Sequence, residues 1–127
     1  MDKALLREKM KQERSQLTEQ DRHQFAQEAA HRLMGAELLV SCENVGIFSS
    51  IGTEIDTGPL FSDLMDSGRR VFFPKMDKSS RSLNWGQVDT LGSMVEGPYG
   101  VLEPESATSS VADLDLIVVP GLGFGLN

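Results

Sequence analysis

The chain has 127 residues, 39% of them hydrophobic and 24% charged, which is the composition of one globular domain and excludes a disordered chain. It has no run of roughly 18–20 apolar residues that could span a bilayer, no apolar signal segment in its charged N-terminal part and a single cysteine, Cys42, so we expect a cytoplasmic protein without disulfides or a thiolate metal cage. The net charge is −7, and the 95 residues after Arg32 carry five Lys or Arg against thirteen Asp or Glu, which argues against a nucleic-acid partner because such binding needs a cationic surface.

The first predicted element is a helix over residues 2–15, which contain no Gly or Pro and place Leu6 and Met10 on one face. A row of basic side chains runs beside that face: Lys3, Arg7, Lys11 and Arg14. Cations spaced in this way can grip a triphosphate, and they are also the ordinary pattern of a solvated helix face. The sequence leaves both interpretations open.

A second helix is predicted to begin at Thr18, because Asp21 three residues later completes a capping box. Its expected buried face consists of small and apolar residues: Phe25, Ala26, Ala29, Ala30, Leu33 and Met34.

A strand, a helix and another strand follow. Residues 45–48 predict a short strand, Thr57 is the expected N-cap of a helix that ends at Gly68, and residues 70–74 predict the next strand. This succession within about 30 residues is typical of a βαβ unit with parallel strands. We therefore expect a single α/β domain with a mostly parallel sheet flanked by helices, three-layered and Rossmann-like.

The remainder of the chain is expected to be loop-like from 75 to 110, with one further strand at 82–87. Residues 114–119 form an apolar run that predicts a strand buried on both faces in the centre of the sheet. Gly121, Gly123 and Gly125 follow it. Their spacing differs from that of a dinucleotide-binding loop and favours a tight exit from a buried strand.

The loop at 49–57, between the first strand and its helix, contains the candidate substrate carboxylate. Glu54 suits a ligand with amide or amino groups because a carboxylate accepts two donors at once, whereas Asp56 is typical of a helix cap. His23 and His31 lack a third ligand, so no zinc site is predicted, and Cys42 is interpreted as an inert thiol.

Five segments in order resemble one family: KALLR, FSSIGTEIDT, VFFPKM, GPYGVLEP and DLDLIVVPGLGF. Together they are similar to the 5-formyltetrahydrofolate cyclo-ligases, also called methenyltetrahydrofolate synthetases, over essentially the whole chain. The resemblance implies ATP-dependent, Mg-assisted ring closure of 5-formyltetrahydrofolate to 5,10-methenyltetrahydrofolate. In that reaction the formyl oxygen is phosphorylated, the N10 amine closes the ring and phosphate departs.

The resemblance also implies roles for five residues. Lys3 and Arg7 belong to the ATP site, and Ser49 and Glu54 line the folate site. Tyr99, in the segment GPYG, occupies a position where the family often has an aromatic ring near the pterin. The alternative for Tyr99 is a ring that packs within its own turn.

Members of this family usually continue after PGLGF with an Asp and a Gly-rich stretch that wraps the ATP phosphates and helps to place Mg. Here Gly125 stands where Asp is common, and Asn127 is the last residue. We therefore interpret residues 1–127 as the N-terminal two-thirds of one cyclo-ligase domain and expect impaired turnover. Two alternatives are a non-catalytic relative that binds folate or a partner, and a generic nucleotide-binding α/β module.

Overall fold

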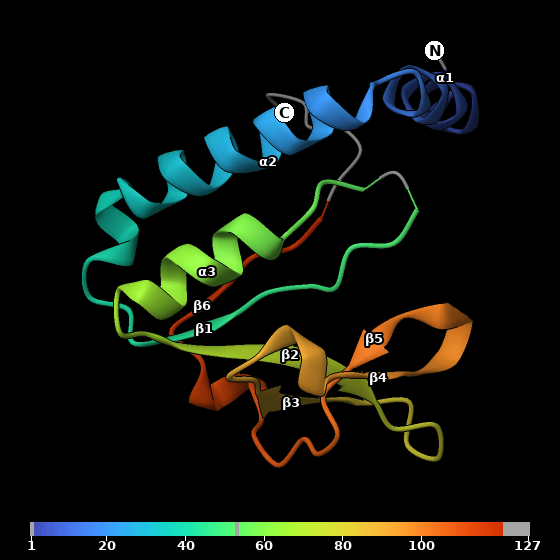
Figure 1. Ribbon diagram of the computed structural model, residues 1–127. Coiled ribbons are helices and arrows are strands. Elements are labelled where there is room, and N and C mark those ends of the chain that lie inside the picture. The colour runs from blue at the N-terminus through green and yellow to red at the C-terminus, as the bar shows by residue number, and fades with distance from the viewer. Residues whose placement is uncertain (1, 53, 121–127) are drawn as a thin grey trace.

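The computed structural model describes residues 2–52 and 54–120, so the glycines at 121, 123 and 125 lie outside the described residues. Figure 1 shows a sheet with α2 (Glu19–Met34) and α3 (Gly58–Asp66) stacked on one side of it. A largely non-helical stretch, which follows the third strand, lies on the other side. The predicted class, α/β with a mostly parallel sheet in a single domain, is confirmed.

The N-terminal helices begin where the sequence predicts. The first, α1 (Lys3–Ser15), buries none of its side chains. At the start of α2, Asp21 N donates to Thr18 Oγ1 over 3.0 Å and Thr18 N donates to Asp21 Oδ2 over 3.3 Å, which is the predicted capping box. No helix among the described residues is long and apolar enough to cross a membrane.

The predicted buried face of α2 is partly wrong. Ala26 and Ala30 are buried, but Phe25 and Ala29 are exposed. Adjacent residues lie about 100° apart around a helix with 3.6 residues per turn. Because the narrow stripe that contains Ala26 and Ala30 faces α3, Phe25 and Ala29 are turned toward solvent.

The main sheet has the strand order β3-β2-β1-β6, from β1 (Asn44–Gly46), β2 (Arg70–Met76), β3 (Leu83–Gln87) and β6 (Leu116–Ile117). β1 pairs in parallel with β2 and β6, and β3 pairs antiparallel with β2. The predicted βαβ unit is thus β1-α3-β2, and Gly68, with φ +82°, lies just beyond the end of α3 as expected. Pro74 does not end β2, because β1 stops at Gly46 and needs no N–H from that position.

Alternate residues of the sheet face its two sides. Val45, Ile47, Val71 and Phe73 belong to the core shared with α2 and α3. Gly46 faces the other side, where an added Cβ would lie 2.8 Å from Cζ3 of Trp85 and 2.8 Å from Cδ1 of Leu114. A glycine is required at 46 because these two side chains cover β1 there.

The remaining elements are short, in keeping with the predicted loop-like texture. β4 (Val95–Glu96) and β5 (Leu102–Glu103) form a two-stranded hairpin of their own. The other elements are single 3-10 turns: η1 (Glu37–Leu39), η2 (Leu91–Ser93), η3 (Pro98–Gly100) and η4 (Val111–Asp113).

The expectation of a central strand over 114–119 is wrong. β6 contains two residues and pairs with β1 alone among the described strands, so it lies at an edge of the sheet. Leu116 and Ile117 are half-buried, and Val119 is 68% exposed. An apolar run signals a tendency toward burial, but strand order decides whether a strand has neighbours on both sides, and strand order depends on contacts distant in sequence.

One carboxylate connects β6 to the start of β1. Oδ2 of Asp115 accepts hydrogen bonds from Asn44 N and Glu43 N, both over 2.9 Å. These two donors, chiefly Asn44 N, and to a smaller degree the Arg70 guanidinium, hold the pKa of Asp115 below its usual value of 3.8.

The lowered pKa of Asp115 predicts a pH-dependent contribution to folding. A carboxylate whose pKa is lower in the folded state stabilises the fold above its unfolded pKa, and this contribution is lost as the pH falls through the folded value. We expect Asp115→Asn to lower the urea midpoint at pH 7, and the difference from the parent protein to shrink below pH about 4. An equal difference at pH 7 and pH 3 would contradict this, and Asp89→Asn is the control at an exposed position.

Candidate functional site

The candidate site lies beyond the carboxyl ends of the parallel strands, where ligands of open α/β sheets bind. The loop at 49–57 leaves β1 there and is closed by side-chain hydrogen bonds. Ser50 Oγ donates to Ile55 O over 2.6 Å, Thr57 N donates to Ser50 Oγ over 3.1 Å, and Thr57 Oγ1 donates to Phe48 O over 3.0 Å. Because Thr57 is 8% exposed, the loop has a buried polar anchor.

The cap of α3 differs from the prediction. Thr57 occupies the N-cap position, but its side chain makes no capping bond, because its hydroxyl donates instead to Phe48 O, two residues beyond β1. Oδ1 of Asp56 accepts from Gly58 N over 2.9 Å. Asp56 is therefore the cap-like carboxylate that the sequence analysis expected.

Ser49 and Glu54 both lie on this loop, and both make hydrogen bonds within the protein. Ser49 Oγ donates to Leu102 O, in β5, over 2.7 Å. Oε1 of Glu54 accepts from Ile51 N over 3.0 Å, within a turn that contains Gly52 at φ +57°. Among the described contacts, no hydrogen bond reaches Oε2 of Glu54. This carboxylate oxygen is therefore available to a ligand.

Tyr99 lies at the tip of the hairpin between β4 and β5. Its side chain is 95% exposed, so the alternative of a ring packed in its own turn is wrong. Its backbone has φ +60°, followed by Gly100 at φ +73°. A non-glycine residue in the left-handed region is uncommon, and such residues are concentrated at functional sites.

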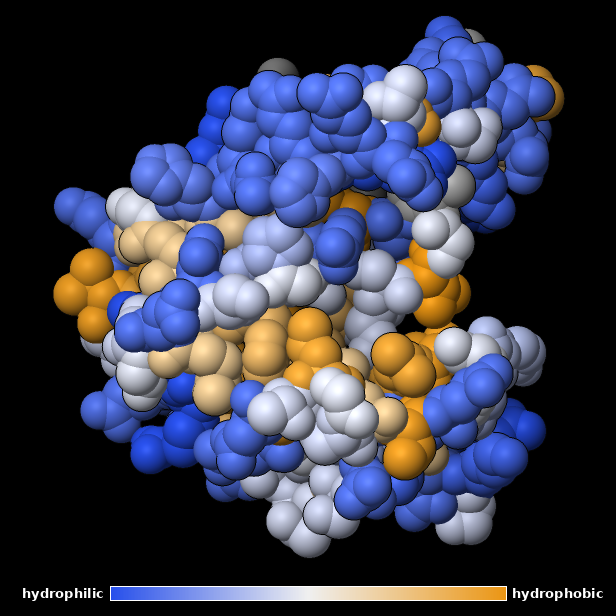
Figure 2. Space-filling view, in the orientation of Figure 1, coloured by the Kyte–Doolittle hydropathy of each residue, from blue (hydrophilic) through white to orange (hydrophobic). Residues whose placement is uncertain are grey.

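Lys3 and Arg7 are exposed on α1, apart from the loop and the hairpin in sequence. Figure 1 places α1 above the loop at 49–57, and Figure 2 shows the outline of the molecule hollowed between this end and the β4–β5 region. No hydrogen bond or ion pair within residues 2–52 and 54–120 joins either cation to the loop. Among the described residues, the structure therefore does not bring Lys3 and Arg7 into bonding contact with the loop.

Two adjoining cavities lie at the strand ends. The smaller, about 140 Å³, has a polar wall of Ser49, Ser50 and Thr57. Its apolar wall consists of four residues from three segments: Phe73 of β2, Leu91 and Met94 at η2, and Leu102 of β5. No pattern in the sequence indicates these four as site residues, because Phe73 falls in a strand predicted for the core and the other three fall in a stretch without hydrophobic periodicity.

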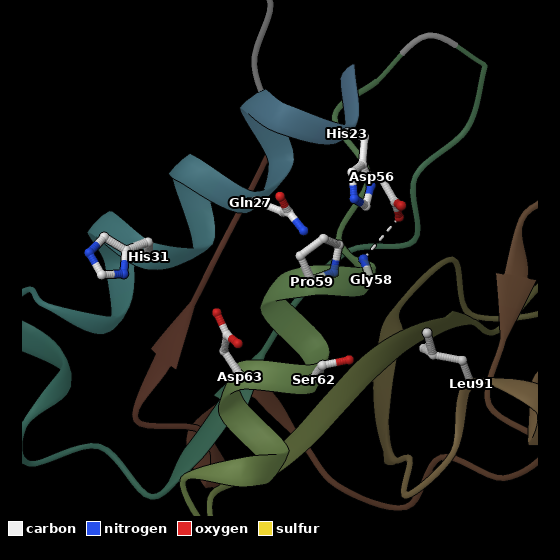
Figure 3. Close-up of a pocket in the computed structure, with 9 residues that line it drawn as sticks. All are labelled: His23, Gln27, His31, Asp56, Gly58, Pro59, Ser62, Asp63 and Leu91. Carbon is white, nitrogen blue, oxygen red and sulfur yellow. Dashed lines mark hydrogen bonds between the residues drawn. The ribbon is translucent and has the colours of Figure 1, made fainter. Parts of the chain in front are cut away.

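The larger cavity, about 630 Å³, shares Asp56, Gly58 and Leu91 with the smaller one. Figure 3 shows His23 and Gln27 of α2 directed toward the start of α3, with Asp56 beside His23. Its volume falls within the roughly 300–1,000 Å³ of small-molecule sites, whereas the smaller cavity is below that range. Together the two cavities have hydrogen-bonding side chains around the apolar wall of the smaller one.

The described residues contain no group of three or more His, Cys, Asp or Glu side chains that could hold a metal ion. His23 and His31 both line the larger cavity, and Figure 3 shows them well apart along α2. Cys42 is buried, and its thiol donates to Leu38 O over 3.2 Å. Among the described residues, these side chains do not by themselves form a Mg site.

Comparison with known proteins relates this arrangement to one family. The model of the 5-formyltetrahydrofolate cyclo-ligase family matches residues 1–127. The 5-formyltetrahydrofolate cyclo-ligase of Escherichia coli is 28% identical over 119 residues, which is 91% of this chain and 65% of the relative. The chain thus spans less than two-thirds of that protein's length.

Two solved structures share the fold. The NMR structure of the Aquifex aeolicus 5,10-methenyltetrahydrofolate synthetase matches with a TM-score of 0.80 and 25% identity, over 100% of this chain and 69% of that one. The 5,10-methenyltetrahydrofolate synthetase of Mycoplasma pneumoniae matches with a TM-score of 0.63 and 18% identity, over 98% and 66% of the respective chains. At that lower identity the second likeness concerns the fold.

The hydrogen-bonded closure of the loop predicts that Thr57→Val is destabilising. Valine has nearly the same shape but cannot donate to Phe48 O, so a part-buried carbonyl loses its partner. We expect the free energy of unfolding to fall by about 1–3 kcal/mol, measured by urea denaturation followed through Trp85 fluorescence. Thr90→Val, at an exposed position, is the control, and an equal effect of the two substitutions would contradict the anchoring role.

Proposed function

Since the chain belongs to the 5-formyltetrahydrofolate cyclo-ligase family, we propose that it takes part in the ATP-dependent cyclisation of 5-formyltetrahydrofolate to 5,10-methenyltetrahydrofolate. The observation that carries the proposal is the family match together with the loop at 49–57, which side-chain hydrogen bonds hold at the carboxyl ends of the parallel strands. Family membership also disfavours the generic nucleotide-binding module. A cytoplasmic location remains an expectation of the same proposal.

The proposed chemistry must remove a formyl oxygen, which is a poor leaving group. Transfer of the γ-phosphoryl group of ATP to that oxygen, with ADP as the other product, converts it into a phosphate ester. The N10 amine then forms the new C–N bond, phosphate departs with the C–O bond electrons, and N10 loses its proton. Enzymatic phosphoryl transfer depends chiefly on positioning and on neutralising charge.

Glu54 is the proposed pterin ligand. The 2-amino and ring N–H groups of a pterin are adjacent donors, which a carboxylate can accept. Oε1 is already held by Ile51 N, and this bond fixes the orientation of the carboxylate and leaves Oε2 for the ligand. The apolar wall of the smaller cavity supplies a surface for the ring, and Tyr99 is the proposed stacking partner.

Lys3 and Arg7 are the proposed ligands of the ATP phosphates. Both are exposed on the same helix, four residues apart, and can follow a flexible polyphosphate. Mg²⁺ usually binds phosphates through one or two carboxylates and several waters. Its participation is therefore part of the proposal, although no described cluster of ligands supports a particular position.

Glu54→Gln tests the folate site. We expect the affinity for 5-formyltetrahydrofolate, measured by calorimetry, to fall tenfold or more, or about 1.4 kcal/mol, because an amide cannot accept two donors with the strength of a carboxylate. The thermal midpoint should stay close to that of the parent protein. Glu105→Gln is the control at an exposed carboxylate. No binding by the parent chain, or equal affinities of the parent and Glu54→Gln, would contradict the assignment.

Lys3→Ala and Arg7→Ala test the nucleotide site. Each is expected to weaken ATP binding tenfold or more, about 1.4 kcal/mol, with little change in melting temperature because neither side chain is buried. Lys9→Ala, on another face of α1, should leave ATP affinity unchanged. Equal effects of the three substitutions would indicate a solvated helix face. Methenyl product, detected by absorbance after addition of both substrates and Mg, distinguishes catalysis from folate binding alone.

A further inference from the structure

Glu103, in β5, is the only charged residue that is buried among the described ranges 2–52 and 54–120, with 8% of its surface exposed. Burial of a carboxylate is unfavourable unless hydrogen bonds compensate for the lost water. We therefore expect the buried carboxylate of Glu103 to have a hydrogen-bond donor that compensates for its burial.

The contact is with the end of β2. Oε2 of Glu103 accepts from Met76 N over 3.1 Å, across 27 residues of sequence. The side chain passes beneath Gly97 on the opposite arm of the hairpin, where an added Cβ would overlap the carboxylate and lie 2.8 Å from Cγ of Glu103. Gly97 N donates to Val101 O over 2.7 Å, so the narrow part of the hairpin closes directly over this carboxylate.

The residue before Glu103 carries a second anchor. Ser49 Oγ, just past β1, donates to Leu102 O over 2.7 Å. The base of the hairpin is thus tied at consecutive residues to the chain beyond β1 and to the end of β2. Tyr99 lies a few residues away at the tip, 95% exposed and in the left-handed region.

We infer that Glu103 is a positioning residue, which sets where the β4–β5 hairpin holds the Tyr99 ring relative to the loop at 49–57. It acts through the backbone of β5 and does not touch the ligand. The identity of that ligand, 5-formyltetrahydrofolate, rests on the proposed function. The alternative is that Glu103 only stabilises the fold, in which case its loss would lower stability and leave the environment of Tyr99 unchanged.

The free protein offers a direct measurement, since the chain contains a single tyrosine. Labelling with 3-fluorotyrosine gives one ¹⁹F resonance, whose shift and linewidth report the environment and mobility of Tyr99. We expect Glu103→Ala to shift and narrow this resonance, and Glu103→Gln, whose side-chain oxygen still accepts from Met76 N, to leave it near the parent position. Glu96→Ala, an exposed carboxylate on the same hairpin, is the control for charge.

Gly97→Ala tests the same contact without altering Glu103. The new methyl group must displace the carboxylate from Met76 N, because the carboxylate is the flexible partner in the overlap. The backbone at 97, with φ −107° and ψ −159°, is extended and accepts alanine. Gly92→Ala, which meets no atom within 4 Å, is the matched control. If Glu103→Ala fails to fold, Gly97→Ala decides the question.

Titration with 5-formyltetrahydrofolate completes the experiment. Glu103→Ala and Gly97→Ala should weaken its binding tenfold or more and leave ATP affinity unchanged, while Glu103→Gln and Gly92→Ala bind as the parent does. Parent-like ¹⁹F spectra for both Glu103→Ala and Gly97→Ala, even with a lowered melting temperature, would overturn the positioning role. Failure of the parent chain to respond to the folate would overturn the proposed function, while the spectra of the free variants would still decide the role of Glu103.

Discussion

The whole arrangement depends on β1, a strand of three residues with a parallel neighbour on each side. It pairs with β2 through Asn44, Val45 and Gly46 and with β6 through the last two of these. Val45 and Ile47 have no exposed surface and face the helices, whereas Gly46 lets Trp85 and Leu114 approach the opposite face. A strand of three residues makes few hydrogen bonds. It is stabilised by packing on both of its faces and by pairing along both of its edges.

The position of β1 also determines where the candidate site lies. The chain leaves its carboxyl end through the loop at 49–57 and returns through α3 to β2, so the loop is anchored at both ends by the core. At the end of this loop Thr57 donates a hydrogen bond to Phe48 O, and at its beginning Ser49 donates one to Leu102 O in β5. Hydrogen bonds from these two residues therefore anchor both ends of the loop above the sheet.

The groups proposed to contact substrates lie at the periphery of this framework. Lys3 and Arg7 are on a helix without buried residues, and Tyr99 is at the tip of a hairpin. These side chains are exposed, which is compatible with the ligands proposed for them: a rigid pterin ring beside Tyr99 and a charged polyphosphate beside Lys3 and Arg7. The buried polar residues are placed behind these groups: Thr57 holds the loop at 49–57, and Glu103 holds the base of the hairpin that carries Tyr99.

The sequence by itself determined the elements whose stabilising bonds are local. These elements depend on residues close together in the chain: the capping box of Thr18 and Asp21, the cap-like Asp56, Gly68 just beyond the end of α3, and the strands β2 and β3. The ordered motifs identified the family and, with it, the candidate loop. Tertiary structure alone decided the edge position of β6, the exposure of Phe25 and Ala29, and the bonds from Ser49 to Leu102 and from Met76 to Glu103. The physical reason is separation: these bonds join residues 53 and 27 positions apart. No local pattern of hydrophobicity or capping specifies which distant backbone group a buried side chain will meet.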